Sequence, residues 1–257
     1  MNLKDKLTAF YTILIKEVLR FSRIWLQTIL PPVITTSLYF VIFGGLIGPR
    51  IGEMQGFDYM DFIVPGLIMM AIITNAYANV VSSFYLSKFS RSIEEMLVSP
   101  VPNYIILLGY IGGGVARGLT VGIAVTLVSL FFSDLQIHNF WVVISVAILT
   151  AMLFSLAGFI NGVFAQSFDD ISIIPTFVLT PLTYLGGIFY SVTLLSPFWQ
   201  KVSLINPILY MINAFRYGVL GISDISLWIS YAIILTFIAV LFTFSLVMLN
   251  KGTGIRS

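Results

Sequence analysis

Long uncharged stretches dominate this chain of 257 residues and limit what it can fold into. Most are long enough to cross a bilayer, whose apolar core of about 30 Å needs roughly 20 residues of helix. Only 9% of the residues are charged and 58% are hydrophobic, whereas about a quarter are charged in an ordinary soluble domain. The sequence therefore excludes a water-soluble globule and predicts an all-α membrane protein. The uncharged stretches are 24–49, 62–87, 96–116, 118–133, 139–168, 171–200 and 225–250.

Six transmembrane helices are predicted from the lengths of these stretches and the charges that bound them. An even number of spans places both termini on one side of the membrane. If that side is the cytoplasm, the inner segments hold nine lysines and arginines and the outer segments three, which agrees with the usual charge bias. We expect one domain over 1–257 with cytoplasmic termini and with spans at 24–47, 62–86, 104–132, 140–164, 171–190 and 225–249.

The first 23 residues predict an amphipathic helix that lies in the membrane surface. At 100° per residue, its apolar side chains share one face and most of its charged side chains lie opposite. The apolar face comprises Leu3, Leu7, Phe10, Leu14, Val18 and Phe21, and the polar face Asp5, Lys16, Arg20 and Arg23.

The segment 191–224 is too apolar for an ordinary external loop, yet prolines and polar residues interrupt it. A seventh span at 202–220 would move the C-terminal charges outside, against the charge bias. A re-entrant hairpin of two short helices, broken at Asn206 and Pro207, keeps both termini together and lets the polar groups face water or protein. We therefore expect the re-entrant hairpin.

The loop 88–100, between the second and third spans, predicts a short amphipathic helix. Ser92 and Glu95 have the spacing of a capping box, and Pro100 ends the helix. From the local sequence alone, a helix that lies on the membrane and a helix that docks a partner remain equally open.

The residues needed for chemistry are missing from this sequence. It has no cysteine, so disulfides, thiolate nucleophiles and cysteine-ligated metals are excluded, and its one histidine, His138, cannot make a usual metal site alone. No phosphate-binding loop, nucleophile elbow or zinc-protease motif occurs. The small net charge of +2 suggests no nucleic-acid partner. We expect neither an enzyme nor a bound cofactor.

Polar and small residues inside the predicted spans have competing interpretations. Arg117 either snorkels to the cytoplasmic headgroups, which we favour, or acts in gating or substrate contact. The glycines of the third span, from Gly109 to Gly122, predict close helix packing. Six polar residues either line a cavity for an amphipathic substrate or join helices by hydrogen bonds. They are Asn75, Tyr77 and Asn79 in the second span and Thr180, Thr183 and Tyr184 in the fifth.

Two motifs carry a resemblance to a known family. Residues 181–191 (PLTYLGGIFYS), followed by Asn206-Pro207, Tyr210, Arg216 and Gly221, form one, and residues 94–100 (EEMLVSP) form the other. Together with the six spans and the amphipathic leader, they make the whole chain similar to the ABC-2 type transporter permeases, and in particular to the YadH-type permeases of bacterial inner membranes.

The resemblance implies a permease that forms a homodimer in the lipid bilayer and docks two copies of a separate ATP-binding cassette ATPase. Mg-ATP would bind that partner and not this chain. The segment 88–100 would then be the coupling helix, 1–23 a connecting helix and 191–224 the re-entrant hairpin that closes the outer end. The expected docking residues are Ser92, Ile93, Glu94, Glu95, Met96 and Leu97, with the two glutamates binding basic partner residues and the apolar three forming a seat.

The function implied is ATP-driven export of an amphipathic cargo, such as a drug-like molecule, a lipid or a polysaccharide. The alternative is a secondary carrier, or a membrane scaffold, that uses no ATPase. The motif residues expected to shape or gate the pathway are Pro181, Gly186, Gly187, Asn206, Pro207 and Arg216.

Overall fold

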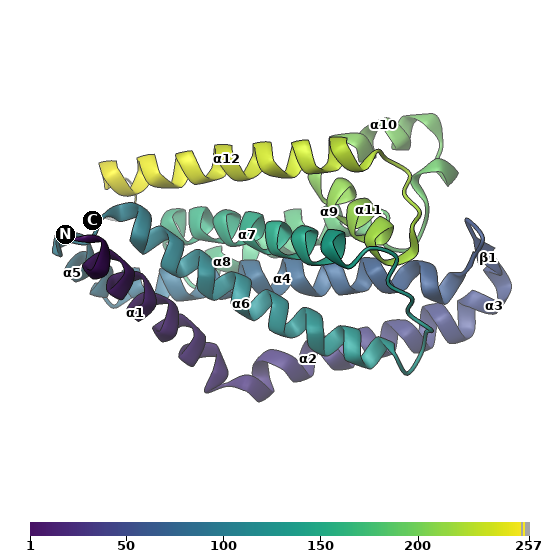
Figure 1. Ribbon diagram of the computed structural model, residues 1–257, viewed down its shortest axis with the longest axis horizontal. Coiled ribbons are helices and arrows are strands. Elements are labelled where there is room, and N and C mark those ends of the chain that lie inside the picture. The colour runs from purple at the N-terminus through teal and green to yellow at the C-terminus, as the bar shows by residue number, and fades with distance from the viewer. Residues whose placement is uncertain (253, 255–257) are drawn as a thin grey trace.

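The computed structural model describes residues 1–252 and residue 254, and its long helices run side by side along one axis (Figure 1). Five helical segments are long and apolar enough to cross a membrane. The start of α1, the end of α12 and the short helix α5 lie at one end of the bundle, which we call the docking end; β1, α3 and α10 lie at the far end. The five segments are Trp25–Ile51 (α2 Trp25–Tyr39, a π-helix Phe40–Ile47 and α3 Gly48–Ile51), α4 Tyr59–Phe89, α6 Asn103–Ser129, α7 Phe140–Phe164 and α12 Leu227–Lys251.

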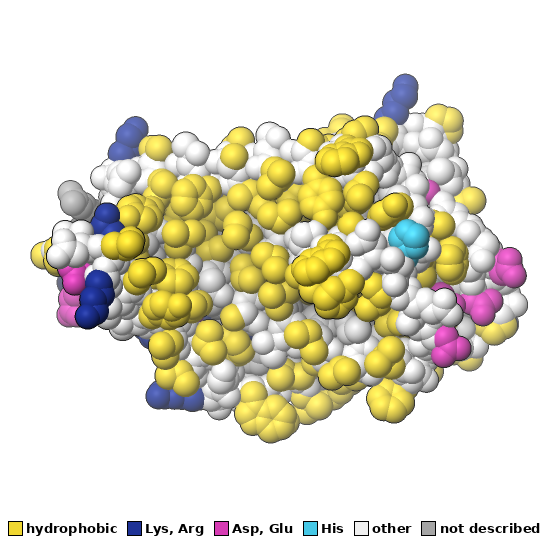
Figure 2. Space-filling model, in the orientation of Figure 1, with side chains coloured by type: hydrophobic (Ala, Val, Ile, Leu, Met, Phe, Trp, Pro, Cys, Tyr) yellow, Lys and Arg dark blue, Asp and Glu magenta, His cyan; other side chains and the backbone are white. Residues whose placement is uncertain are grey.

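These five segments begin and end within about one or two helical turns of five of the predicted spans. Hydrophobic side chains cover the middle of the visible face, whereas charged side chains gather toward the two ends (Figure 2). That distribution is the one a bilayer requires of the surface that faces lipid.

Helix α4 lies at the centre of the bundle. In its most apolar stretch 83% of the residues are buried, whereas the same share is 11% in the segment that contains α2 and 22% in α12. Small residues let neighbouring helices approach it. A Cβ placed on Gly118 of α6 would lie 3.0 Å from the Cβ of Ala76, and one on Gly158 of α7 would meet the backbone oxygen of Tyr77. The predicted close packing of the third span is therefore present, because its glycines bring the backbones together.

The predicted fifth span, 171–190, differs from expectation, and the predicted count of six spans is not confirmed. The helical stretch ends at Tyr184 and consists of α8 Asp170–Ile174, a π-helix Pro175–Leu179 and α9 Thr180–Tyr184. Its 15 residues rise only about 22 Å. The chain then turns at Gly187, whose φ of 78° suits glycine.

At the start of α8, the backbone NH groups of Gln166 and Ser167 and the Ser167 hydroxyl hold the pKa of the Asp170 carboxyl below its usual range.

The segment 191–224 holds a 3-10 turn Val192–Leu194 and two short helices, α10 Pro197–Ile205 and α11 Pro207–Leu220. The chain breaks at Asn206, where the two helices were predicted to separate. The Asn206 side chain accepts the backbone NH of Ile208 and so caps α11. Fourteen helical residues rise about 21 Å, so the alternative of a seventh span is not supported. Re-entry of this segment into a bilayer stays a prediction.

A two-stranded hairpin of β1 Glu53–Met54 and β2 Phe57–Asp58 precedes α4, and it was not predicted from the sequence. Both turn residues have positive φ, 55° at Gln55 and 83° at Gly56, as a tight hairpin turn requires.

The amphipathic leader forms α1, Leu3–Ser22, but the residues that it buries against the bundle include only Phe21 from the predicted apolar face. Its buried residues are Ile13, Glu17 and Phe21. Leu3, on the predicted apolar face, is 75% exposed, and Arg20, on the predicted polar face, reaches α4. The reason is that α4 supplies polar partners for Glu17 and Arg20, which local amphipathicity does not record.

Candidate functional site

Helix α5, Ser92–Val98, lies at the docking end, and three of its apolar side chains pack against the bundle. Ile93 is 1% exposed and packs in one cluster with residues of α1, α4, α6, α7 and α12, and Met96 and Leu97 are partly buried against the same cluster. The predicted apolar seat for a partner is therefore wrong for Ile93, which anchors α5 to its own bundle. Glu94, Glu95 and the 87% exposed Val98 are the side chains that α5 presents outward.

The predicted capping box of α5 does not form. Ser92 is the first residue of the helix, and the preceding Arg91 has a left-handed backbone with φ of 58°. The Ser92 hydroxyl donates to the backbone oxygen of Ser87 in α4, 3.3 Å away, and Glu95 makes no cap contact. A tight turn and a bond to α4 thus fix where α5 begins, and the Glu95 carboxylate is left free of a capping role.

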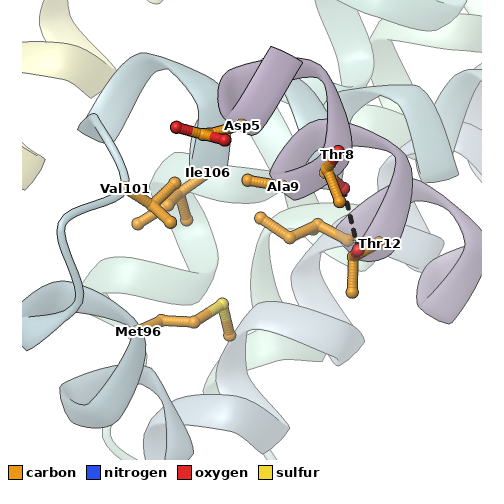
Figure 3. Close-up of a pocket in the computed structure, with 8 residues that line it drawn as sticks. Asp5, Thr8, Ala9, Thr12, Met96, Val101 and Ile106 are labelled. Carbon is orange, nitrogen blue, oxygen red and sulfur yellow. Dashed lines mark hydrogen bonds between the residues drawn. The ribbon is translucent and has the colours of Figure 1, made fainter. Parts of the chain in front are cut away.

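Two hollows adjoin α5. The first, of about 380 Å³, lies between α1 and the α5–α6 segment, with Met96 on one wall and Thr8 and Thr12 on the other (Figure 3). The second, of about 480 Å³, is lined by Arg91 and Glu94 together with the ends of α4 and α7. There the Lys88 ammonium donates to the backbone oxygens of Val163 and Ala165 at 2.8 and 2.9 Å, which ties the end of α4 to the end of α7.

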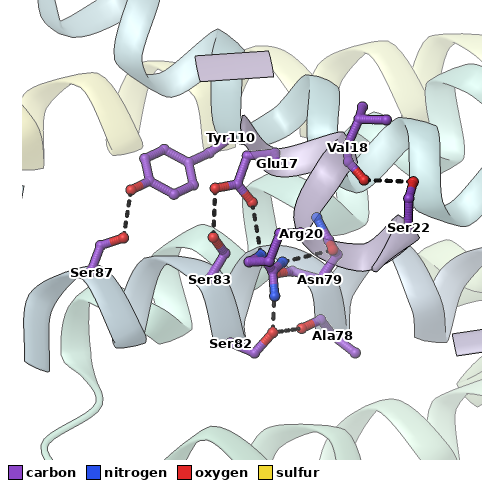
Figure 4. Close-up of polar contacts among 10 residues, drawn as sticks. All are labelled: Glu17, Val18, Arg20, Ser22, Ala78, Asn79, Ser82, Ser83, Ser87 and Tyr110. Atoms are coloured by element: carbon purple, nitrogen blue, oxygen red, sulfur yellow. Dashed lines mark hydrogen bonds and ion pairs between the residues drawn. The ribbon is translucent and has the colours of Figure 1, made fainter. Parts of the chain in front are cut away.

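A line of polar side chains runs along α4 from the middle of the helix toward α5. We call Asn75, Asn79, Ser83 and Ser87 the polar ladder; their four-residue spacing places them on one side of the helix. The ladder contacts α1 and α6 (Figure 4). Sequence reasoning identified Asn75 and Asn79 but missed the two serines, although the spacing was available as a signal.

Glu17 of α1 is fully buried at the centre of these contacts. Its carboxylate accepts the Ser83 hydroxyl at 2.7 Å and lies 3.4 Å from the Nε of Arg20. Arg20 also donates to the backbone and side-chain oxygens of Asn79 at 2.9 and 2.7 Å, and the Tyr110 hydroxyl donates to Ser87 at 2.9 Å. The leader helix is therefore joined to the centre of the bundle by the hydrogen bonds of Glu17 to Ser83 and of Arg20 to Asn79, which the sequence did not reveal.

Arg117 lies next to the ladder on α6. One of its terminal nitrogens is 3.5 Å from the side-chain oxygen of Asn75, and its Nε is buried without a partner. The favoured prediction that Arg117 snorkels to the headgroups is therefore wrong, because the guanidinium turns toward α4 in the middle of the bundle.

The six candidate cavity residues are separated by the fold. A cavity of about 230 Å³ between α2 and α4 is lined by Asn75 but by none of the other five. The Tyr184 hydroxyl lies 3.1 Å from that of Tyr39, which lines the cavity. Asn79 binds Arg20, the Tyr77 hydroxyl is buried without a partner, and Thr180 and Thr183 donate to backbone oxygens of their own helical stretch.

The motif residues expected to shape the pathway come together near the far end. Arg216 of α11 is 1% exposed, donates to the backbone oxygen of Gly187 at 2.6 Å and stacks 3.9 Å from the ring centre of Phe62. Asn206 donates to the backbone oxygen of Leu182 at 2.6 Å. Pro181 and Pro207 occupy first-turn positions of α9 and α11, where a missing NH is harmless, and Gly186 lies directly against Ile208 and Ile212.

A carboxylate that sequence reasoning did not select, Asp224, completes this region. It accepts the side chains of Gln55 and Ser191 and the backbone NH of Val192. Asn213 accepts the backbone NH of Asp224. Over residues 1–252 and 254, no group of three or more histidine, cysteine, aspartate or glutamate side chains is placed to hold a metal ion.

Comparison with known proteins gives consistent matches over most of the chain. The sequence model of the ABC-2 type transporter family matches residues 8–220. The inner membrane transport permease YadH of Escherichia coli K12 and that of Shigella flexneri are each 61% identical to this chain over 97% of both lengths. Nodulation protein J of Neorhizobium galegae is 24% identical over 74% of both chains.

Proposed function

Because this chain belongs to the ABC-2 type transporter family, we propose that it is the membrane subunit of an ATP-driven exporter that docks a separate ATP-binding cassette ATPase at α5. It is a multi-pass transport permease of the inner membrane. In this proposal two copies of the chain form a homodimer, two ATPase subunits bind Mg-ATP, the docking end faces the cytoplasm, and the cargo is amphipathic.

The observation that carries the docking proposal is the division of α5 into two faces. Ile93 fixes the helix to the bundle, while Glu94 and Glu95 point outward at the end that also holds the start of α1 and the end of α12. Exposed carboxylates form charge-assisted hydrogen bonds with lysine or arginine on a partner. Since Ser92 binds Ser87 of α4, a partner that displaces α5 also displaces the central helix of the bundle.

This arrangement supports a lever mechanism. Nucleotide binding would move the ATPase, α5 would follow, and the bundle would change between inward-open and outward-open states by rigid-body motion. ATP drives that change only if it binds the ATPase more tightly in one state than in the other. The permease then contributes the pathway, and the partner contributes the chemistry.

The amphipathic cargo is supported by the cavity between α2 and α4. Its walls combine apolar residues such as Leu67 and Met70 with the carboxamide of Asn75, and a mostly apolar site with few polar groups suits an amphiphile. Dimerisation is supported by α2, whose apolar surface is largely exposed in the single chain.

The docking proposal is tested with a Glu94→Arg, Glu95→Arg double variant and the matched charge reversal Glu53→Arg at the exposed far end. We expect the double variant to lose at least about tenfold in affinity for the ATPase, because two attractive contacts become repulsive. Glu53→Arg should co-purify with the ATPase as the wild type does. Retention of the complex and of cargo-stimulated ATP hydrolysis by the double variant would show that α5 does not dock the ATPase.

Proteoliposomes test the class of transporter. With the purified ATPase present, we expect transport that requires ATP. Transport by this chain alone, driven by an ion gradient, would instead identify the secondary carrier that the sequence left as the alternative, and transport under neither condition would favour a membrane scaffold.

A further inference from the structure

Arg117 is an unusual charge for its position. Within the five long apolar segments that the structure describes, every other charged side chain lies in or next to a first or last turn, namely Arg50, Asp61, Lys88 and Lys251. Arg117 instead lies near the middle of α6. A charge at that depth is costly and marks a functional site unless it is paired.

No carboxylate pairs with Arg117 in the described residues. Its closest polar contact is the neutral side-chain oxygen of Asn75 at 3.5 Å, and its Nε has no partner. The nearest buried acid, Glu17, is engaged by Arg20 and Ser83. The two arginines and one glutamate therefore leave one positive charge uncompensated beside the polar ladder.

The cavity between α2 and α4 adjoins that charge through Asn75. Asn75 lines the cavity and contacts Arg117, so it forms the link between the hollow and the guanidinium. Thr35 and Thr36 of α2 and Thr74 of α4 add polar groups to its walls. The volume of about 230 Å³ is that of a headgroup and is smaller than the several hundred Å³ of a typical site for a whole drug-sized ligand.

Apolar surface for the rest of an amphiphile lies beside the cavity. Ile34 and Leu38 are exposed on the adjoining face of α2, four residues apart. A ligand with its headgroup in the cavity could lay a hydrocarbon chain along this face, where lipid would otherwise lie. The unpaired charge of Arg117, the small volume of the cavity and the apolar surface of α2 thus all fit an amphiphile with a small, negatively charged headgroup.

We propose that this cavity binds the anionic headgroup of an amphiphilic cargo, and that Arg117, held by Asn75, determines the preference for negative charge. The inference rests on the proposed function in that it treats the cavity as part of the transport pathway. It adds the sign of the cargo's charge and the residue that selects it.

Binding to the purified full-length permease tests this inference without the ATPase. In phosphatidylcholine nanodiscs, we expect dodecyl phosphate to bind at least about tenfold more tightly than dodecyltrimethylammonium, both below their micelle concentrations. Arg117→Gln should remove that preference and Arg117→Lys should largely keep it, because lysine retains the charge. Arg50→Gln, the same change at an exposed site on α3, should leave it unaltered.

The wild-type measurement alone can overturn the inference: equal affinities for the two dodecyl compounds would exclude an anion-selective site. Thermal unfolding of each variant identifies one that has simply lost its fold, in which case the Arg117→Lys comparison decides. A permease that fails to bind any ATPase but still prefers dodecyl phosphate would contradict the docking proposal and leave the anion site standing.

A further arm separates cargo from resident lipid. We measure ATP hydrolysis by the complex of permease and ATPase in the presence of dodecyl phosphate. If the compound stimulates hydrolysis by the wild type but not by Arg117→Gln, it binds as cargo. If phosphatidylglycerol displaces dodecyl phosphate and neither compound changes hydrolysis, the site holds a structural lipid and the assignment to cargo is wrong.

Discussion

The polar ladder of α4 and the Asp224 cluster at the far end both join separate segments of the chain through polar contacts, but they differ in which segments they join and in how completely their groups are paired. The Asp224 carboxylate accepts hydrogen bonds from the side chains of Gln55 and Ser191 and from the backbone NH of Val192. Because Asp224 lies at the end of the segment 191–224, just before α12, these bonds join the two ends of that segment to the β1–β2 hairpin. Most of its contacts involve groups in turns and loops. The cluster therefore closes the far end on itself.

The ladder joins long helices and remains incompletely paired. Asn79 Nδ2 and Arg117 Nε are buried without partners, while Glu17, Arg20 and Ser83 are tightly connected. Buried polar groups that lack partners cost free energy, so an arrangement that supplies partners is favoured when one becomes available. The Nε of Arg216, near the far end, is also buried without a partner, so the contrast holds for the two clusters and not for the two ends. Both oxygens of the Asp224 carboxylate have partners, which suits a cluster that holds its shape, whereas the ladder retains capacity for a ligand and ends next to α5.

The largest effect should follow from Glu17→Ala. This change leaves Arg20 beside a cavity and without its carboxylate, and we expect the free energy of unfolding to fall by about 3 kcal/mol, as on breaking a largely buried ion pair. This loss is at the low end of the range for breaking a buried ion pair, because a quarter of the Arg20 side chain is exposed and the Asn79 side chain still accepts a hydrogen bond from it. Denaturation in mixed micelles measures the change.

Glu17→Gln is the matched control, since it keeps the side-chain volume and an acceptor for Ser83. It should lose less than Glu17→Ala. If both variants unfolded at the wild-type denaturant concentration, the ladder would not hold α1 to the bundle, and the contrast with the Asp224 cluster would disappear.

Asp224→Ala should have the next largest effect, about 2 kcal/mol, because Gln55, Ser191 and the backbone NH of Val192 lose a common acceptor. The loss should be confined to the far end. Hydrogen exchange is therefore expected to rise in the β-hairpin and at the start of α12, with α5 and the ladder unchanged. Increased exchange in α5 would mean that the two ends are not independent.

Several elements could be predicted from sequence because one local property determines each. Phe140–Phe164 was predicted with its exact bounds, since a long uncharged stretch ends at polar residues on both sides. The fifth span was misjudged because hydrophobicity records neither the π-helix at Pro175 nor the turn at Gly187. The break at Asn206 was predictable because Asn-Pro both caps and starts a helix.

The candidate site was harder, because its residues are defined by contacts between distant segments. Glu17 and Ser83 lie 66 positions apart, and a helical wheel of the leader alone cannot show that a glutamate turns inward. Arg117 was singled out as the one charge within a span, but its orientation depends on Asn75 of α4. Ile93 was recognised as apolar, yet only packing decides whether an apolar residue faces the bundle or a partner.

The smallest effect tests how closely α1 must approach α6. A Cβ on Gly113 would overlap the Cβ of Glu17, whose position is fixed by Ser83 and Arg20, so Gly113→Ala should push α1 outward and lower the free energy of unfolding by about 1 kcal/mol. The matched control is Gly45→Ala, where a Cβ would meet nothing within 4 Å and no destabilisation is expected. Because Asp224 is remote from this contact, the double variant Gly113→Ala, Asp224→Ala should show additive losses, whereas Gly113→Ala, Glu17→Ala should lose less than the sum. Additivity in the second pair would mean that Gly113 acts elsewhere than at the ladder.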